Sequence, residues 1–186
     1  MRNLSVKKLT MAGVMAALVF VMTYVPKVPV PVTGGYVHLG DGAIFLAVLL
    51  LGPLGIPAAA IGSGLADILG GYLVYALPTM AIKALVALIA WKVYKPDSQQ
   101  LVATVTDSEG KTVWKIWKDG SWLRAVIAFV VAEAAMVLGY FAFESVMYGA
   151  AAAWAAVSAN CIQGVAGVAL GLVCHALYPR MKQIVK

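Results

Sequence analysis

The sequence predicts an all-α integral membrane protein with six transmembrane helices and both termini in the cytoplasm. Of its 186 residues, 62% are hydrophobic and 12% are charged, whereas about half of a soluble domain is apolar and about a quarter is charged. Most of the apolar stretches approach or exceed the roughly 20 residues that a helix needs to cross a bilayer. These stretches are 9–25, 42–51, 56–73, 77–94, 125–143 and 150–177. We therefore expect one membrane domain, residues 1–186.

The first three helices follow from their flanking residues. Basic residues precede the first stretch as in a signal peptide, but no Ala-x-Ala-like cleavage site precedes Pro26, so we expect a retained helix. The second and third stretches are separated by residues 52–57, which contain two glycines and two prolines. Because these residues cannot continue a helix, they predict a tight turn.

The loop between the first two helices has an unusual pattern. Residues 26–32 alternate proline with apolar residues, which favours extended backbone. Such a segment is suited to cover the mouth of a pocket as a lid, and a simple connector is the alternative.

The only sizeable polar region lies between the fourth and fifth helices, at residues 95–121. Residues 101–106 and 112–117 are β-prone and are joined by a turn-forming segment, which predicts a short β-hairpin. We expect this hairpin in the cytoplasm, with a structural role more than a chemical one.

The basic residues predict the orientation, because loops rich in Lys and Arg remain cytoplasmic. With both termini inside, only Lys27 is extracellular and only Lys83 lies within a span. The other twelve are cytoplasmic: Arg2, Lys7, Lys8, Lys92, Lys95, Lys111, Lys115, Lys118, Arg124, Arg180, Lys182 and Lys186. This explains the net charge of +6 without nucleic acid, since the basic residues are spread over separate loops.

Ionisable residues inside spans are candidates for function, because each costs several kcal/mol in a bilayer unless it is paired or faces water. In this topology Asp67, Lys83, Glu133 and Glu144 all fall in the extracellular half.

Helical spacing adds polar neighbours to these groups. Thr79 lies four residues before Lys83, and Tyr140 lies between the two glutamates at intervals of seven and four. A cluster of charges, amides and aromatic rings that opens outward fits a small polar heteroaromatic ligand. The candidate ligand-binding residues are His38, Asp67, Thr79, Lys83, Glu133, Tyr140, Trp154, Asn160 and Gln163.

Some of these candidates have structural alternatives. For Lys83 the alternative is an ion pair with Asp67 or Glu133, and for Asn160 and Gln163 it is hydrogen bonding between helices. His38 is equally well explained as an ordinary loop histidine.

Other chemistry is not indicated. Cys161 and Cys174 are thirteen residues apart on one helix, too far for a disulfide, and have no partners at metal spacing. The sequence has no phosphate-binding loop, zinc-protease motif or hydrolase elbow, so we expect no metal, no cofactor and no ATPase activity. Any energy input must come from a partner or a gradient.

The first helix carries a flat surface of small residues. Ala12 and Ala16 are four residues apart, with Gly13 and Ala17 beside them, so that another helix can approach closely. Packing within the six-helix bundle would explain the same pattern.

Several segments resemble the substrate-binding S components of energy-coupling factor (ECF) vitamin transporters, and the resemblance covers nearly the whole chain. They are AGVMA at 12–16, GDGAIF at 40–45, LGP at 51–53, GSGLADILGGY at 62–72, and Pro78-Thr79 to Lys83. The later segments are similar to S components assigned to vitamin B6 or hydroxymethylpyrimidine. The polar loop at 95–121 is longer than the family pattern, which leaves subgroup and substrate open.

The resemblance implies a non-enzymatic subunit in a bacterial plasma membrane that captures a vitamin, pyridoxine, pyridoxal or hydroxymethylpyrimidine, on the outer face. It implies docking through Ala12 and Ala16 on a transmembrane coupling subunit driven by two ATPases. The pocket would lie under residues 26–40 and among the fourth to sixth helices. Two other classes of protein remain as alternatives. One is an intramembrane enzyme that uses Asp67 and Glu133 to act on a lipid-like substrate, and the other is a structural assembly factor.

Overall fold

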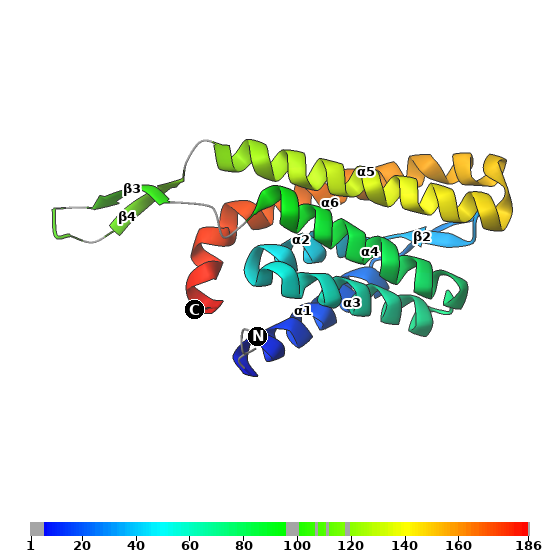
Figure 1. The fold of residues 1–186 in the computed structure, drawn as a ribbon, viewed down its shortest axis with the longest axis horizontal. Coiled ribbons are helices and arrows are strands. Elements are labelled where there is room, and N and C mark those ends of the chain that lie inside the picture. The colour runs from blue at the N-terminus through cyan, green and yellow to red at the C-terminus, as the bar shows by residue number, and fades with distance from the viewer. Residues whose placement is uncertain (1–5, 96–100, 107, 111, 118–119, 186) are drawn as a thin grey trace.

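The computed structural model describes residues 6–95, 101–106, 108–110, 112–117 and 120–185. Six α-helices account for most of these residues, and two small β-hairpins interrupt them (Figure 1). The helices are α1 (Val6–Tyr24), α2 (Gly40–Leu51), α3 (Gly55–Gly70), α4 (Leu73–Tyr94), α5 (Gly120–Tyr148) and α6 (Ala150–Val185). Each covers one of the predicted apolar stretches, so the all-helical prediction is confirmed.

Five segments are long and apolar enough to cross a membrane: Val6–Tyr24, Gly40–Gly70, Leu73–Tyr94, Trp122–Tyr148 and Ala150–Tyr178. The second of these contains both α2 and α3. Large apolar side chains such as Leu138 and Val165 are exposed on the outside of the bundle, as expected of surfaces that face lipid.

The chain turns back between α2 and α3. A 3₁₀ turn, Gly52–Leu54, separates them, and Gly52 has φ of +59°, a conformation that L side chains rarely adopt. Gly55 has no room for a side chain, because a Cβ there would lie 2.8 Å from the Val48 nitrogen. The predicted tight turn is therefore present and allows α2 and α3 to pack closely.

The loop after α1 folds into a hairpin that the sequence did not predict. Strand β1 (Val28–Val30) pairs antiparallel with β2 (Gly35–Val37), and Val28 is opposite Val37. The extended backbone expected from the prolines is present in β1. Pairing was not predictable from the short β2 segment, which contains only three residues.

The polar loop between α4 and α5 contains the predicted hairpin, β3 (Leu101–Thr106) with β4 (Thr112–Trp117). It projects from one end of the bundle, the end at which α1 begins and α6 finishes, away from β1 and β2 (Figure 1). Residues 96–100, 107, 111, 118 and 119 of this loop lie outside the described residues.

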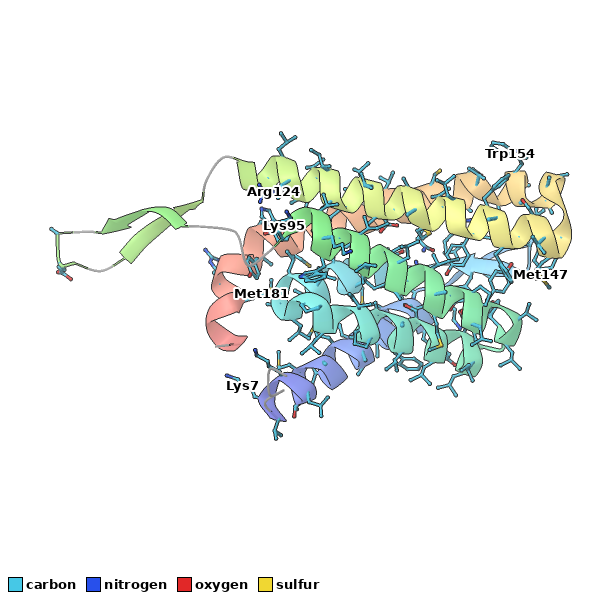
Figure 2. All side chains as sticks on the ribbon, in the orientation of Figure 1. Lys7, Lys95, Arg124, Met147, Trp154 and Met181 are labelled. Atoms are coloured by element: carbon cyan, nitrogen blue, oxygen red, sulfur yellow. The ribbon has the colours of Figure 1, made fainter. Side chains whose placement is uncertain are left out.

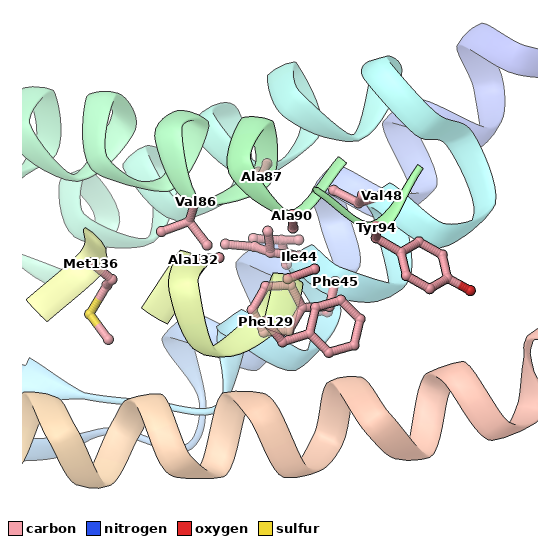
Figure 3. Close-up of a cluster of buried hydrophobic side chains, with 14 of the residues drawn as sticks. Ile44, Phe45, Val48, Val86, Ala87, Ala90, Tyr94, Phe129, Ala132 and Met136 are labelled. Atoms are coloured by element: carbon pink, nitrogen blue, oxygen red, sulfur yellow. The ribbon is translucent and has the colours of Figure 1, made fainter. Parts of the chain in front are cut away.

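Aromatic rings pack the core between the helices (Figure 3). The rings of Phe45 and Phe129 stack with centroids 4.3 Å apart, and Tyr94 stacks on Phe129 at 6.1 Å. Helix α6 approaches this stack at Gly171, where a Cβ would lie 2.6 Å from the Phe45 ring. The contact joins α2, α4, α5 and α6 and fixes the helices that carry the polar site.

Candidate substrate-binding site

A pocket lies between the β1–β2 hairpin and helices α3 to α6. The space between its walls is about 410 Å³ when the open solvent at its mouth is counted. Ten of its thirteen lining residues carry a polar side-chain group, although the surrounding bundle is apolar. The lining residues are Val30, Thr33, Gly35, Tyr36, His38, Asp67, Tyr75, Thr79, Tyr140, Glu144, Ala156, Asn160 and Gln163.

The hairpin contributes Tyr36 to one wall. Its hydroxyl donates a 2.6 Å hydrogen bond to Asp67 Oδ1 on α3, and its ring lies 4.5 Å from the ring of Tyr72. Burial and the neighbouring Asp67 carboxylate raise the pKa of Tyr36 above its ordinary value. The phenol therefore remains protonated and joins the hairpin to the end of α3.

Two further tyrosines shape the opposite side. The Tyr75 hydroxyl lies 2.9 Å from the carbonyl oxygen of Thr33 and 3.3 Å from Glu144 Oε1, so its one proton is shared between two acceptors. The hydroxyls of Thr79 and Tyr140 are 3.0 Å apart and hydrogen-bonded. These contacts connect the hairpin, α4 and α5 around the pocket.

Gln163 on α6 connects the pocket to a buried ion pair. The His38 backbone N–H donates to Gln163 Oε1 at 3.0 Å, and Gln163 Nε2 donates to Asp41 Oδ2 at 2.8 Å. Lys83 Nζ in turn donates to Asp41 Oδ1 at 2.6 Å, and both side chains are fully buried. Lys83 is not a lining residue, and its ammonium lies 5.6 Å from the centroid of the Tyr140 ring.

His38 is buried in the loop that leads into α2. Its Nδ1 accepts a 3.0 Å hydrogen bond from the Gly40 N–H, so the neutral ring carries its proton on Nε2. Burial, together with the positive charge of Lys83, lowers the pKa of His38 to about 3. The ring is therefore an uncharged part of the pocket wall at neutral pH.

Glu133 is not among the residues that line the pocket. It is 4% exposed, and neither carboxylate oxygen has a hydrogen-bond partner among the described residues. Gly164 and Gly167 of α6 leave room for this side chain, because a Cβ at either position would crowd it.

Trp154 also lies away from the pocket. It is 66% exposed and packs edge-to-face on Phe141 with centroids 5.0 Å apart. Figure 2 shows the residue on the outer side of the bundle.

The structure thus brings six of the nine candidate ligand-binding residues to one pocket: His38, Asp67, Thr79, Tyr140, Asn160 and Gln163. It adds residues outside the candidate set, most of them from or beside the hairpin: Val30, Thr33, Gly35, Tyr36, Tyr75, Glu144 and Ala156. Glu144 could have been included from its spacing to Tyr140. Thr33 and Tyr36 gave no signal, because polar residues in a loop cost nothing in water.

The small-residue surface of α1 is divided between two environments. A Cβ at Gly62 of α3 would lie against the backbone oxygen of Ala16, so this side of α1 faces α3. Gly13 and Ala17 are exposed, and nothing lies within 4 Å of the Cβ position at Gly13.

Among the described residues, no group of three or more His, Cys, Asp or Glu side chains is arranged to hold a metal ion. The chemistry offered by the pocket is directional hydrogen bonding beside aromatic rings, which is the chemistry of recognition.

An apolar helical bundle with a buried polar pocket at one end, covered by a hairpin, defines a membrane protein that binds a small molecule. Comparison with known families identifies the family to which this membrane protein belongs. Residues 3–180 match the family described as "ECF-type riboflavin transporter, S component", and the chain belongs to this family. It is therefore a multi-pass membrane protein and a substrate-binding transport subunit, not an enzyme.

Two individual proteins are similar to the chain. A solved structure of the S component of a bacterial ECF transporter aligns with a TM-score of 0.60 and 19% identity, covering 97% of this chain and 98% of that one, so the two share a fold. An uncharacterized protein from Pyrococcus woesei is 32% identical over 155 residues, which are 82% of this chain and 88% of that protein.

Proposed function

We propose that this S component captures a small nitrogen-heterocyclic vitamin from outside the cell, in the pocket beneath the β1–β2 hairpin. The observation that carries the proposal is a buried pocket lined with hydrogen-bonding groups and aromatic rings inside an apolar bundle. Burying polar groups without partners is costly, and a ligand that satisfies these groups accounts for their presence in an apolar bundle.

The proposed topology is six spans with both termini in the cytoplasm of a bacterial cell. The reversal at Gly52–Leu54 supports separate crossings for α2 and α3. It is also supported by the Tyr36–Asp67 hydrogen bond, because this contact brings the end of α3 to the loop that precedes α2.

The charge distribution supports the same orientation. Lys92, Lys95 and Arg124 lie at the ends of α4 and α5 nearest the β3–β4 hairpin, whereas Lys27 precedes β1 beside the pocket. By the positive-inside tendency, the pocket then opens to the outside. Residues 1–186 form one membrane domain in this proposal, with 95–121 inserted on the cytoplasmic side.

The sequence favours a one-ring substrate, a vitamin B6 compound or hydroxymethylpyrimidine. The rings of Tyr36, His38 and Tyr140 offer surfaces for such a heterocycle, and Asn160 and Gln163 offer amide hydrogen bonds. Riboflavin is a second candidate, favoured by the description of the family to which the chain belongs.

Uptake would need partners. The proposal assigns them as the transmembrane coupling subunit and two ATPases of an ECF module, with docking through Ala12 and Ala16. The exposed Gly13 and Ala17 extend this surface along α1, and small residues allow close helix contact within a bilayer.

The test is mass spectrometry of small molecules released when detergent-purified protein is denatured, supported by titration with pyridoxine, hydroxymethylpyrimidine and riboflavin. We expect wild type and Ile162→Ala to bind one of these vitamins, and Gln163→Ala to bind it much more weakly. Ile162 is the matched control because it is adjacent in sequence and 69% exposed. A bound lipid, or equal binding by both variants, would contradict the proposal.

A further inference from the structure

The pocket contains two carboxylates that are not fully satisfied. Asp67 of α3 and Glu144 of α5 both line it, and each is 3% exposed. One oxygen of each accepts from a tyrosine hydroxyl, Tyr36 for Asp67 and Tyr75 for Glu144. The second oxygens, Asp67 Oδ2 and Glu144 Oε2, accept no hydrogen bond of good geometry among the described residues, although the hydroxyls of Thr79 and Thr33 lie near the two carboxylates.

A buried carboxylate oxygen without a donor is unfavourable, since it has lost its water and gained nothing in exchange. The two carboxylates come from different helices and face the same pocket. A ligand that donates hydrogen bonds would satisfy both, which is the second indication of a binding site besides the pocket itself.

Lys83 and Lys27 do not line the pocket, although each lies near a ring of its wall. Lys83 is in an ion pair with Asp41, and neither residue is part of the lining. Lys27 Nζ lies 4.0 Å from the centroid of the Tyr24 ring, and it is within 5.4 Å of the Tyr36 and Tyr72 rings. Within the part of the chain that the structure describes, no Lys or Arg lines the pocket, and the His38 ring, which accepts from Gly40, is uncharged.

We propose that Asp67 and Glu144 make this pocket selective by charge. It accepts cationic or neutral heterocycles that donate hydrogen bonds through amino or hydroxymethyl groups, and it excludes ligands that carry a carboxylate or a phosphate. The reason is electrostatic: an anion would lie close to two carboxylates in a site shielded from water, with no cation of the lining to compensate. The inference rests on the proposed function, because it specifies the substrate class of the same pocket.

The sharpest test uses probes that share one ring and differ in a single substituent. Pyridoxamine, pyridoxine and 4-pyridoxic acid carry an aminomethyl, a hydroxymethyl and a carboxylate group at the same ring position. Riboflavin and its 5′-phosphate provide a second matched pair. Dissociation constants are measured by calorimetry on the full chain in detergent at pH 7.

We expect the amine and the alcohol to bind, and 4-pyridoxic acid to bind at least 100-fold more weakly. If the flavin pair binds in place of the pyridines, the phosphate ester should be weaker than riboflavin by a similar factor. An acid or phosphate ester that binds within threefold of its neutral counterpart would overturn the selectivity and leave the proposed function standing. If no probe binds, the proposed vitamin class and the selectivity both fail.

Variants assign the selectivity to the two carboxylates. Glu144→Gln and Asp67→Asn keep the side-chain size and remove the charge, and each should reduce the preference for pyridoxine over 4-pyridoxic acid, or for riboflavin over its phosphate, at least tenfold. Glu109→Gln, in the turn between β3 and β4, is the control and should leave these ratios unchanged. Unchanged ratios in both pocket variants would overturn the assignment, and the wild-type comparison decides the proposal even if one variant does not fold.

Discussion

Gln163 contacts the hairpin side of the pocket and the buried ion pair at the same time. Its amide oxygen accepts from the His38 N–H at 3.0 Å, and its amide nitrogen donates to Asp41 Oδ2 at 2.8 Å. The side chain is 3% exposed, so water does not replace either contact. One residue of α6 therefore positions the segment that closes the pocket and the carboxylate that holds Lys83.

Replacing this amide should affect binding and stability together. Gln163→Leu leaves the His38 N–H and one Asp41 oxygen without partners, and each loss costs about 1–3 kcal/mol. We expect a lower thermal midpoint in detergent and at least tenfold weaker vitamin binding. The exposed Ile162→Ala should change neither by a comparable amount. Wild-type affinity in Gln163→Leu would show that the amide does not support the pocket.

Lys83 should prove to be structural when its charge is removed alone and then together with that of Asp41. Lys83→Met leaves Asp41 buried and unpaired, which costs about 3–5 kcal/mol. The double variant Lys83→Met, Asp41→Asn removes both charges and should regain a large part of this loss. Thermal unfolding and ligand titration of the three proteins provide the comparison. If Lys83→Met keeps its stability and loses only affinity, the lysine contacts the ligand directly, as the sequence suggested.

His38 should make stability depend on pH in a defined window. Its pKa is about 3 in the folded protein and near 6.5 in an unfolded chain. Between these values the unfolded state binds more protons, so stability falls as pH decreases from 6.5 towards 3, by about 2 kcal/mol at pH 5.

The comparison with His38→Gln isolates this effect from the titration of carboxylates. Thermal midpoints of both proteins at pH 7.5 and pH 5 give the difference. We expect wild type to lose more stability than His38→Gln over this interval. Equal losses would mean that His38 is not held neutral by its surroundings.

A large side chain on the exposed surface of α1 should block docking on the partner subunit and leave vitamin binding unchanged. Gly13→Trp places a large side chain where nothing lies within 4 Å, so the bundle should fold and bind vitamin normally. Ala12→Trp tests the surface predicted from sequence. In cells that contain an ECF module, both variants should lose vitamin uptake and keep their affinity for the vitamin. An uptake rate equal to wild type would contradict the docking assignment.

The fold was largely predictable because lipid imposes a simple pattern. All six helices follow from apolar stretches, and β3 and β4 follow from their β-prone residues and the intervening turn. The β1–β2 hairpin was not predictable, since Val28–Val30 contains proline and Gly35–Val37 is very short. Its pairing depends on tertiary contacts such as Tyr36 with Asp67.

The site residues that could be predicted from the sequence are polar residues within apolar helices, because burying a polar side chain is costly. Asp67, Thr79, Tyr140 and Gln163 are polar residues on apolar helices, and all four line the pocket. The sequence could not tell which way a side chain faces: Lys83 pairs with Asp41 and not with Asp67 or Glu133, and Trp154 is largely exposed. Helical spacing identifies a shared face within one helix, and the partner across helices depends on packing.

An experimental structure of the protein with its vitamin bound would locate the binding site directly. We expect a heterocycle beneath the β1–β2 hairpin, with donor groups within hydrogen-bond distance of Asp67 or Glu144 and with Tyr140 and Gln163 also in contact with the ligand. A vitamin bound elsewhere, or an empty pocket at saturating ligand, would contradict this expectation.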